Sequence, residues 1–193
     1  MSRYRHWVNP EGPLVFLTSS TGGFATVFEW PAVRGLVASI LDAHCFYGAR
    51  LHAYCVMPHH VHFVSWIPQG RTASWFMNRI KSNAAKRVLP LLGPHEIRIL
   101  NEGSEPGRVL WQRSYRRTGL TCGRSFFACV RYVHLNPLRG GLCTDPLDYR
   151  WSSAFLWQEC RWDPQKGLPI SDDLLREYCD PSQLRFGPQP EAG

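Results

Sequence analysis

The chain has 193 residues, of which 44% are hydrophobic and 19% charged, and its net charge is +7. This composition fits one domain with a sizeable core and excludes a disordered, collagen-like or coiled-coil protein; no apolar run approaches the ~20 residues that span a bilayer. No secretory signal follows the N-terminus and the seven cysteines contain no Cys-x-x-Cys pair, so we expect a cytoplasmic protein with neither a zinc knuckle nor a disulfide framework.

Hydrophobic periodicity and turn residues divide the chain into short strands and longer helices. In chain order we expect a strand at 14–19, a helix at 31–44, strands at 51–57 and 60–67, a helix at 72–89, a loop rich in proline and glycine at 93–107, a strand at 109–115, a helix at 125–136 and a short helix at 151–157. Pro137 is expected to end the third long helix. This order predicts an α+β fold, with helices packed on a small antiparallel sheet.

The basic charge lies in the first part of the chain. Residues 1–142 hold 17 Lys and Arg against 6 Asp and Glu, whereas residues 143–193 hold 5 against 9. Of the 22 basic residues 19 are arginine, whose guanidinium binds phosphate with two hydrogen bonds and stacks on bases. The bias indicates a nucleic-acid partner, although a GC-rich genome produces the same bias.

The strongest local motif is a pair of histidines on the second strand of a predicted hairpin. Because side chains alternate along a strand, His60 and His62 share one face, while Val61 and Phe63 occupy the other. Two imidazoles at this spacing can bind one divalent ion. They are also compatible with histidines that only make hydrogen bonds at the surface or in the core, so the pair alone is a weak motif and leaves both interpretations open.

A second motif lies on the helix predicted at 125–136. Tyr132 and Asn136 are four residues apart and therefore lie on one face, one turn from each other. Together they offer a phenol and an amide oxygen that can bind a metal. The other interpretation is a half-buried tyrosine and an asparagine that precedes Pro137.

Taken together, these motifs resemble a known family. The segments that carry the resemblance are LHAYCVMPHHVH at 51–62, WQRSY at 111–115, YVHLNPLRGGL at 132–142 and DPLDYRWSS at 145–153. They resemble the IS200-like tyrosine transposases, particularly their REP-associated branch, over roughly residues 4–157. On this basis we expect a transposase domain at 1–157 and an acidic, proline-containing appendage at 158–193. One departure is His59, where the family usually has Asn, Asp or Glu.

The resemblance implies a fold, a reaction and a set of site residues. The fold is an RRM-like (ferredoxin-like) antiparallel sheet, with the tyrosine helix near the His-x-His strand. Tyr132 corresponds to the nucleophile, and His60, His62 and Asn136 correspond to the ligands of a divalent metal ion, Mg²⁺ or Mn²⁺. The implied reaction is cleavage and rejoining of single-stranded DNA next to hairpins, through a 5′-phosphotyrosine intermediate. No nucleotide cofactor is implied.

Other residues allow more than one interpretation. Arg113, Arg116 and Arg117 are expected beside the DNA, although a solvated basic face has the same pattern. Trp111 and Tyr115 suit either base stacking or core packing. An alternative function is a domesticated protein that binds hairpin DNA without moving it, and a further one is an RRM-shaped module that binds RNA or metal. We expect a monomer or homodimer.

Overall fold

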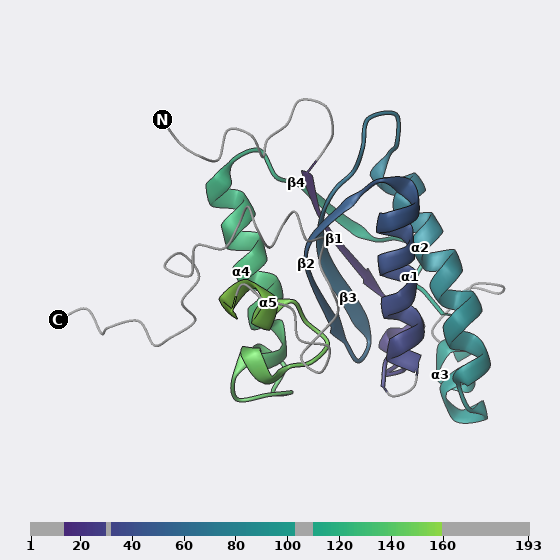
Figure 1. Ribbon diagram of the computed structural model, residues 1–193. Helices are drawn as coiled ribbons and strands as arrows, with labels where there is room; N and C mark the ends of the chain where they lie inside the picture. Colours follow the sequence, from purple (N-terminus) through teal and green to yellow (C-terminus); the bar gives the residue numbers. More distant parts are fainter. Residues whose placement is uncertain (1–13, 30–31, 103–109, 160–193) are drawn as a thin grey trace, which may run out of the picture.

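The computed structural model describes residues 14–29, 32–102 and 110–159 (Figure 1). Four strands form one antiparallel sheet in the order β2-β3-β1-β4. Their bounds are Leu14–Ser20 for β1, Arg50–Met57 for β2, His60–Trp66 for β3 and Arg116–Gly119 for β4. The prediction of an α+β fold with an antiparallel sheet is confirmed.

Helices cover both faces of the sheet. Figure 1 shows α1 (Ala32–Tyr47) and α2 (Ala73–Val88) on one face, followed by α3 (Pro94–Glu102), and it shows α4 (Gly123–Arg139) with α5 (Ala154–Glu159) on the other. Because each face of the sheet meets a helix layer, strand side chains are buried in both directions. Three short 3₁₀ turns, at Gly22–Phe24, Leu89–Leu91 and Pro146–Asp148, complete the described elements.

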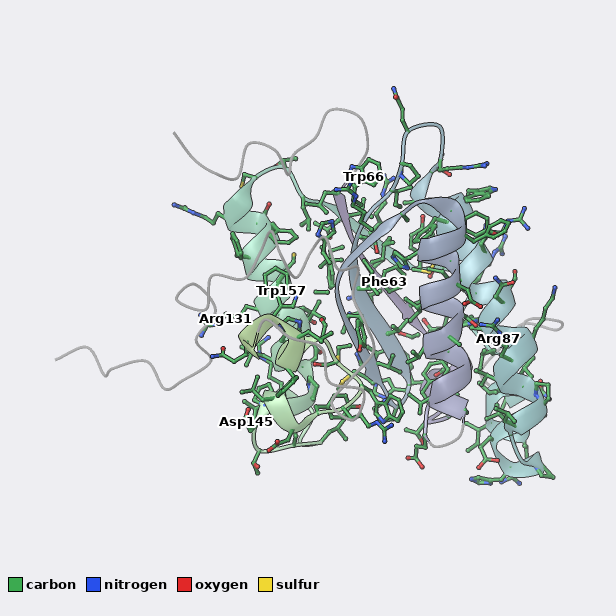
Figure 2. All side chains as sticks on the ribbon, in the orientation of Figure 1. Phe63, Trp66, Arg87, Arg131, Asp145 and Trp157 are labelled. Carbon is green, nitrogen blue, oxygen red and sulfur yellow. The ribbon has the colours of Figure 1, made fainter. Side chains whose placement is uncertain are left out.

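The core therefore has two layers, one on each side of the sheet. Phe63, fully buried, contacts His44 of α1 with 6.0 Å between ring centres. On the other side Trp157 of α5 lies 6.0 Å from Phe126 of α4, and its indole N–H donates to the carbonyl of His52 on β2. Figure 2 shows Phe63 and Trp157 on these opposite sides.

The prediction of a loop at 93–107 is wrong over most of the part that the structure describes, because Pro94–Glu102 form α3. Leu100 of this helix is fully buried and Ile99 packs against the core, so one apolar face anchors it. Pro94 stands at the first position of the helix, where a missing N–H breaks no hydrogen bond. The glycines that suggested a loop flank the helix rather than interrupt it. Residues 103–109 lie outside the described part.

The fourth strand lies later than the predicted 109–115. Trp111 makes one isolated bridge to Thr21, whereas the ladder with β1 is formed by Arg116–Gly119. The prediction failed because β4 has no apolar pattern: all four of its residues are exposed at the edge of the sheet. Backbone hydrogen bonds to β1 define this strand, and a local sequence pattern does not reveal them.

Two predicted helix boundaries also need correction. Pro137 does not end α4, because it is buried inside a helix that continues to Arg139 before Gly140. A proline removes one hydrogen bond, and here its ring packs on the buried face of the helix. The helix predicted at 151–157 begins at Ala154, because residues 151–153 instead pair with β2.

The segment after α4 folds back along the outer edge of β2. The N–H of Val56 donates to the carbonyl of Trp151 at 2.8 Å, and the N–H of Ser153 donates to the carbonyl of Tyr54 at 3.0 Å. The Tyr149 hydroxyl also donates to the carbonyl of Val56. This segment therefore covers backbone groups that an edge strand leaves unpaired.

Two further expectations concern the C-terminal appendage and membrane-spanning helices. The predicted appendage at 158–193 lies outside the described residues, apart from the end of α5, so the division at residue 157 stays a prediction. In the described part of the chain, no helix is long and apolar enough to cross a membrane.

Candidate functional site

Strand β3 presents two imidazoles to the side of the sheet that α4 covers. His60 and His62 face α4, and Val61 and Phe63 are fully buried on the opposite face. The predicted alternation is therefore confirmed. The Nε2 atoms of the two histidines lie 3.0 Å apart, so both rings point their outer nitrogens at one place.

His62 is held in orientation by β1. Thr18 is its partner in the strand register, and the Thr18 hydroxyl makes a 2.7 Å hydrogen bond with His62 Nδ1. Phe16, two residues earlier on the same face, stacks on the His62 ring with 5.6 Å between ring centres. When Nδ1 carries the hydrogen and donates it to Thr18, the lone pair of Nε2 is left to bind an ion.

Both imidazoles are neutral at neutral pH. Burial and, to a smaller extent, the nearby His59 lower the pKa of His60 to about 4. Burial and, to a smaller extent, the nearby His60 and His59 lower the pKa of His62 to about 3, although a side-chain hydrogen bond with Asn136 opposes this shift. The neutral form is the one that binds metals, so protons do not compete for these nitrogens near pH 7.

Helix α4 brings Tyr132 and Asn136 to the histidines. The Tyr132 ring lies edge-on to His62 with 5.5 Å between ring centres, and 41% of the residue is exposed. The Asn136 amide N–H donates to the carbonyl of Tyr132 at 2.8 Å. A side-chain hydrogen bond also links Asn136 to His62. The structure thus gathers all four residues that the sequence motifs singled out.

The donor atoms fit a divalent ion. Two cis ligands that are each about 2.1 Å from an octahedral ion lie about 3.0 Å from each other, the separation found between the two Nε2 atoms. No group of three or more His, Cys, Asp or Glu side chains that could hold a metal ion occurs in the described ranges, and the polar side chain hydrogen-bonded to His62 from α4 is Asn136. Nitrogen-rich donors favour Mn²⁺ over Mg²⁺.

The strand register distinguishes the predicted DNA-binding arginines. Arg116 is opposite Thr18, which places it in the same cross-strand row and on the same face as His62. Arg117 is opposite Leu17 and belongs to the other face. Arg113 is exposed in the segment before β4. One of the three therefore shares a face with the histidines.

Three residues near the site were not identified from the sequence: Phe16, Thr18 and Arg139. The Arg139 guanidinium lies 5.5 Å from the centre of the Tyr132 ring, one helix turn beyond Asn136. A signal existed for Phe16 and Thr18, because they alternate with buried Val15 and Leu17 along β1. The register that pairs Thr18 with His62 is not visible in that alternation.

The structure distinguishes between base stacking and core packing for Trp111 and Tyr115. Trp111 is buried, and its indole N–H donates to the carbonyl of Lys81, so it packs in the core. Tyr115 is half-buried, and its hydroxyl is hydrogen-bonded to Ser74 at 2.7 Å. These contacts favour the packing interpretation for both aromatic residues over base stacking.

Comparison with known proteins shows the family and the fold. The model of the family described as IS200-like transposases matches residues 27–136, and the chain belongs to this family. Its fold is similar to that of a REP-associated tyrosine transposase bound to a REP hairpin, with a TM-score of 0.63 and 19% identity over 88% of this chain and 99% of that chain. A candidate transposase from Deinococcus radiodurans is also similar, with a TM-score of 0.48 and 20% identity over 69% of this chain and 95% of that chain. No curated protein matches the sequence.

Proposed function

We propose that this transposase-family protein cleaves and rejoins single-stranded DNA next to hairpins, with Tyr132 as the nucleophile. The observation that carries the proposal is the position of the phenol. Tyr132 is exposed and can meet an incoming strand, and its ring lies edge-on to His62. The Nε2 atoms of His62 and His60 lie 3.0 Å apart beside it. A nucleophile thus stands beside a set of ligands suited to a scissile phosphate and its counter-ion.

The proposed step exchanges one phosphate ester for another. The Tyr132 phenol oxygen attacks the phosphorus, the bond from phosphorus to the 3′ oxygen breaks, and the phenol proton ends on the 3′-hydroxyl that leaves. The product is a 5′-phosphotyrosine. Since the number of ester bonds is unchanged, a second 3′-hydroxyl can reverse the step without a nucleotide cofactor.

The proposed metal ligands are His60, His62 and Asn136. A divalent ion bound there would offset the charge that develops on the scissile phosphate. The role of Thr18 is to fix the His62 ring, so that Nε2 rather than Nδ1 faces the reaction. All three ligands are uncharged, so the DNA phosphate itself supplies the negative charge that strengthens metal binding.

The proposal includes two arginines that bind DNA phosphates near this centre. Arg116 extends the row of Thr18 and His62 to the edge of the sheet, and Arg139 lies over the Tyr132 ring. A guanidinium can donate two parallel hydrogen bonds to one phosphate. We therefore assign Arg116 to the bound strand and retain Arg113 as an outer contact, whereas Arg117 faces away.

The proposed substrate form draws on the REP-hairpin complex that shares this fold. A palindrome extruded as a hairpin leaves unpaired nucleotides at its base, and these can bend into the line of attack. The net charge of +11 over residues 1–142 provides the electrostatic attraction.

The proposal is tested by trapping the covalent intermediate. Labelled hairpin DNA with unpaired flanks is incubated with Mn²⁺ and either the wild type or Tyr132→Phe, and adducts are separated on a denaturing gel. We expect an adduct with the wild type only, because the Phe variant keeps the ring but lacks the oxygen. Tyr115→Phe, which alters a tyrosine bonded to Ser74, is the matched control and should form the adduct.

The outcomes distinguish a protein that cleaves DNA from one that only binds hairpin DNA. An adduct on Tyr132→Phe would show that another residue is the nucleophile. Tight hairpin binding by the wild type without any adduct would leave a DNA-binding protein that does not cleave.

A further inference from the structure

An exposed phenylalanine beside the histidines has an unusual backbone conformation. Phe24 ends the Gly22–Phe24 turn between β1 and α1, and 60% of its surface is exposed. Its φ is +54°, and no other non-glycine residue in the described ranges has a positive φ. This left-handed conformation is unfavourable for a bulky side chain, and the exposed ring gains little burial in return. Such strain at an exposed position is typical of functional sites.

The turn that carries Phe24 is fixed to the β2–β3 turn. The N–H of Thr21 donates to the carbonyl of His59 at 2.9 Å, and the N–H of Phe28 donates to the carbonyl of Pro58 at 2.9 Å. The Thr21 hydroxyl donates to the carbonyl of Ala25 at 2.8 Å, across the turn itself. These bonds hold the strained residue against the segment that leads into His60.

The ring of Phe24 is the outer end of a series of aromatic rings that leads to the nucleophile. The distances between neighbouring ring centres are 6.0 Å from Phe24 to His59, 4.5 Å from His59 to His60 and 4.6 Å from His60 to His62. Tyr132 follows His62 at 5.5 Å. Since stacked nucleotides rise about 3.4 Å each, Phe24 lies within about three nucleotides of His60.

We propose that Phe24 is a stacking platform for one unpaired base, one to three nucleotides from the bond that Tyr132 attacks. The proposal rests on the proposed cleavage of single-stranded DNA and adds the element that positions the strand. An exposed aromatic face binds any unpaired base, whereas bases inside a duplex are already stacked on both faces. Phe24 is therefore a positioning residue, which holds the strand while the phosphate lies at the histidines.

The first test places a fluorescent base beside the hairpin. 2-Aminopurine is introduced at each unpaired position in turn, and fluorescence and affinity are measured for the wild type, Phe24→Ala and Phe24→Trp. We expect stacking to quench one position within three nucleotides of the cleaved bond. Phe24→Ala should lose this quenching and bind about 5- to 150-fold more weakly, whereas Phe24→Trp should retain both.

The matched control is Phe46→Ala. Phe46 is also an exposed phenylalanine, with 82% of its surface accessible, but it lies on α1 on the other side of the sheet, where it contacts Tyr47. The Phe46→Ala variant should quench 2-aminopurine and bind the DNA as the wild type does. Loss of binding in both alanine variants would point to a general effect of removing surface apolar area and would overturn the proposal.

A second variant separates positioning from stability. Phe24→Gly removes the ring and accepts a positive φ without strain, so its melting temperature should equal or exceed that of the wild type while its DNA affinity falls as in Phe24→Ala. A purely structural role would instead lower the melting temperature. At saturating DNA both variants should form the Tyr132 adduct at nearly the wild-type rate, with a raised half-saturation concentration.

The failures of the two proposals are distinguishable. If the wild type forms no adduct, the proposed function fails whatever the Phe24 variants do. If the wild type forms the adduct and Phe24→Ala quenches and binds as the wild type does, only the stacking role is overturned. A change in oligomeric state on sedimentation of Phe24→Ala, with DNA binding intact, would show that Phe24 contacts protein instead.

Discussion

His62 is restrained on three sides. Thr18 bonds its Nδ1 atom, Phe16 stacks on its ring, and Tyr132 lies edge-on to it. Each neighbour comes from β1 or α4, so the orientation of one imidazole depends on the packing of two elements against β3. A ligand fixed in this way loses little rotational freedom when it binds an ion.

Replacing either histidine should remove metal binding. His60→Ala or His62→Ala deletes one of two converging nitrogens, and we expect Mn²⁺ affinity to fall at least tenfold, with loss of metal-dependent cleavage. Asn136→Ala should have a milder effect, because water can replace one neutral oxygen ligand. Isothermal titration calorimetry with Mn²⁺ measures all three; His95→Ala, an exposed histidine on α3, is the control. Unchanged affinity in both histidine variants would refute the ligand assignment.

At the scale of single elements, β4 presents one arginine to each face of the sheet. Arg116 and Arg117 are adjacent and both exposed, yet the antiparallel register with β1 assigns them to opposite faces. Adjacent residues on one strand are thus a natural pair for comparison. They have the same charge, and they differ in the face of the sheet to which they belong.

We expect Arg116→Ala to weaken single-stranded DNA binding more than Arg117→Ala does. The loss for Arg116 should be about 1.5–3 kcal/mol, the range for a hydrogen bond to a charged group, and the loss for Arg117 should be a few tenths. Equilibrium binding of the same unpaired DNA by both variants, at one salt concentration, measures the difference. Equal losses would show that the two arginines contribute only general charge.

The elements show where sequence patterns succeed and where they fail. The helix now assigned to Ala32–Tyr47 was recognisable because its apolar stripe faces the core, and the His-x-His strand was recognisable from alternation. β4 was misplaced because its residues are exposed, so no apolar signal marks it. The same limit applies to the site: the faces of His62 and Tyr132 follow from local periodicity, whereas the contact of Thr18 with His62 depends on a register between distant strands.

At the scale of the whole molecule, both core layers contain buried neutral histidines. Burial lowers the pKa of His44, between α1 and the sheet, to about 4, and that of His134, on α4, to about 3. His44 is well bonded in its neutral form, because its Nδ1–H donates to the carbonyl of Ile40 and the Ser65 hydroxyl lies 2.7 Å from Nε2. Protonation would place a positive charge in the core, away from water.

Acid should therefore destabilise the fold before the carboxylates titrate. A histidine with a pKa near 6.5 unfolded and about 4 folded takes up its proton in the unfolded state first, so stability falls as pH drops from about 6.5 towards 4. For His44 alone the loss between pH 7 and pH 5 is about 2 kcal/mol. Urea denaturation at both pH values checks this. His44→Gln should show a smaller pH difference than the wild type, and an identical difference would contradict the assignment.

The distribution of charge predicts how the molecule responds to salt and to DNA form. If about five phosphates are neutralised by the basic region, log K for single strands should fall with log salt at a slope of about −3.5. The same sequence fully paired should be cleaved little, because a stacked duplex does not bend into line with a tyrosine fixed on a helix. Binding and cleavage of both forms across a salt series measure this. Equal cleavage of duplex, or a flat salt dependence, would contradict it.

The attachment of α4 at both ends has a consequence for how strands are exchanged. Before the helix, the N–H of Leu120 donates to the carbonyl of Leu14; after it, the segment at 149–153 pairs with β2, and Ser153 bonds His134 of the helix. A strand joined to Tyr132 would therefore keep a fixed position relative to the sheet. Which 3′ end attacks it next becomes a competition between diffusing ends, governed by their local concentrations near the enzyme. The released end, while held close by its hairpin, has the higher concentration, so resealing would dominate until that hairpin dissociates.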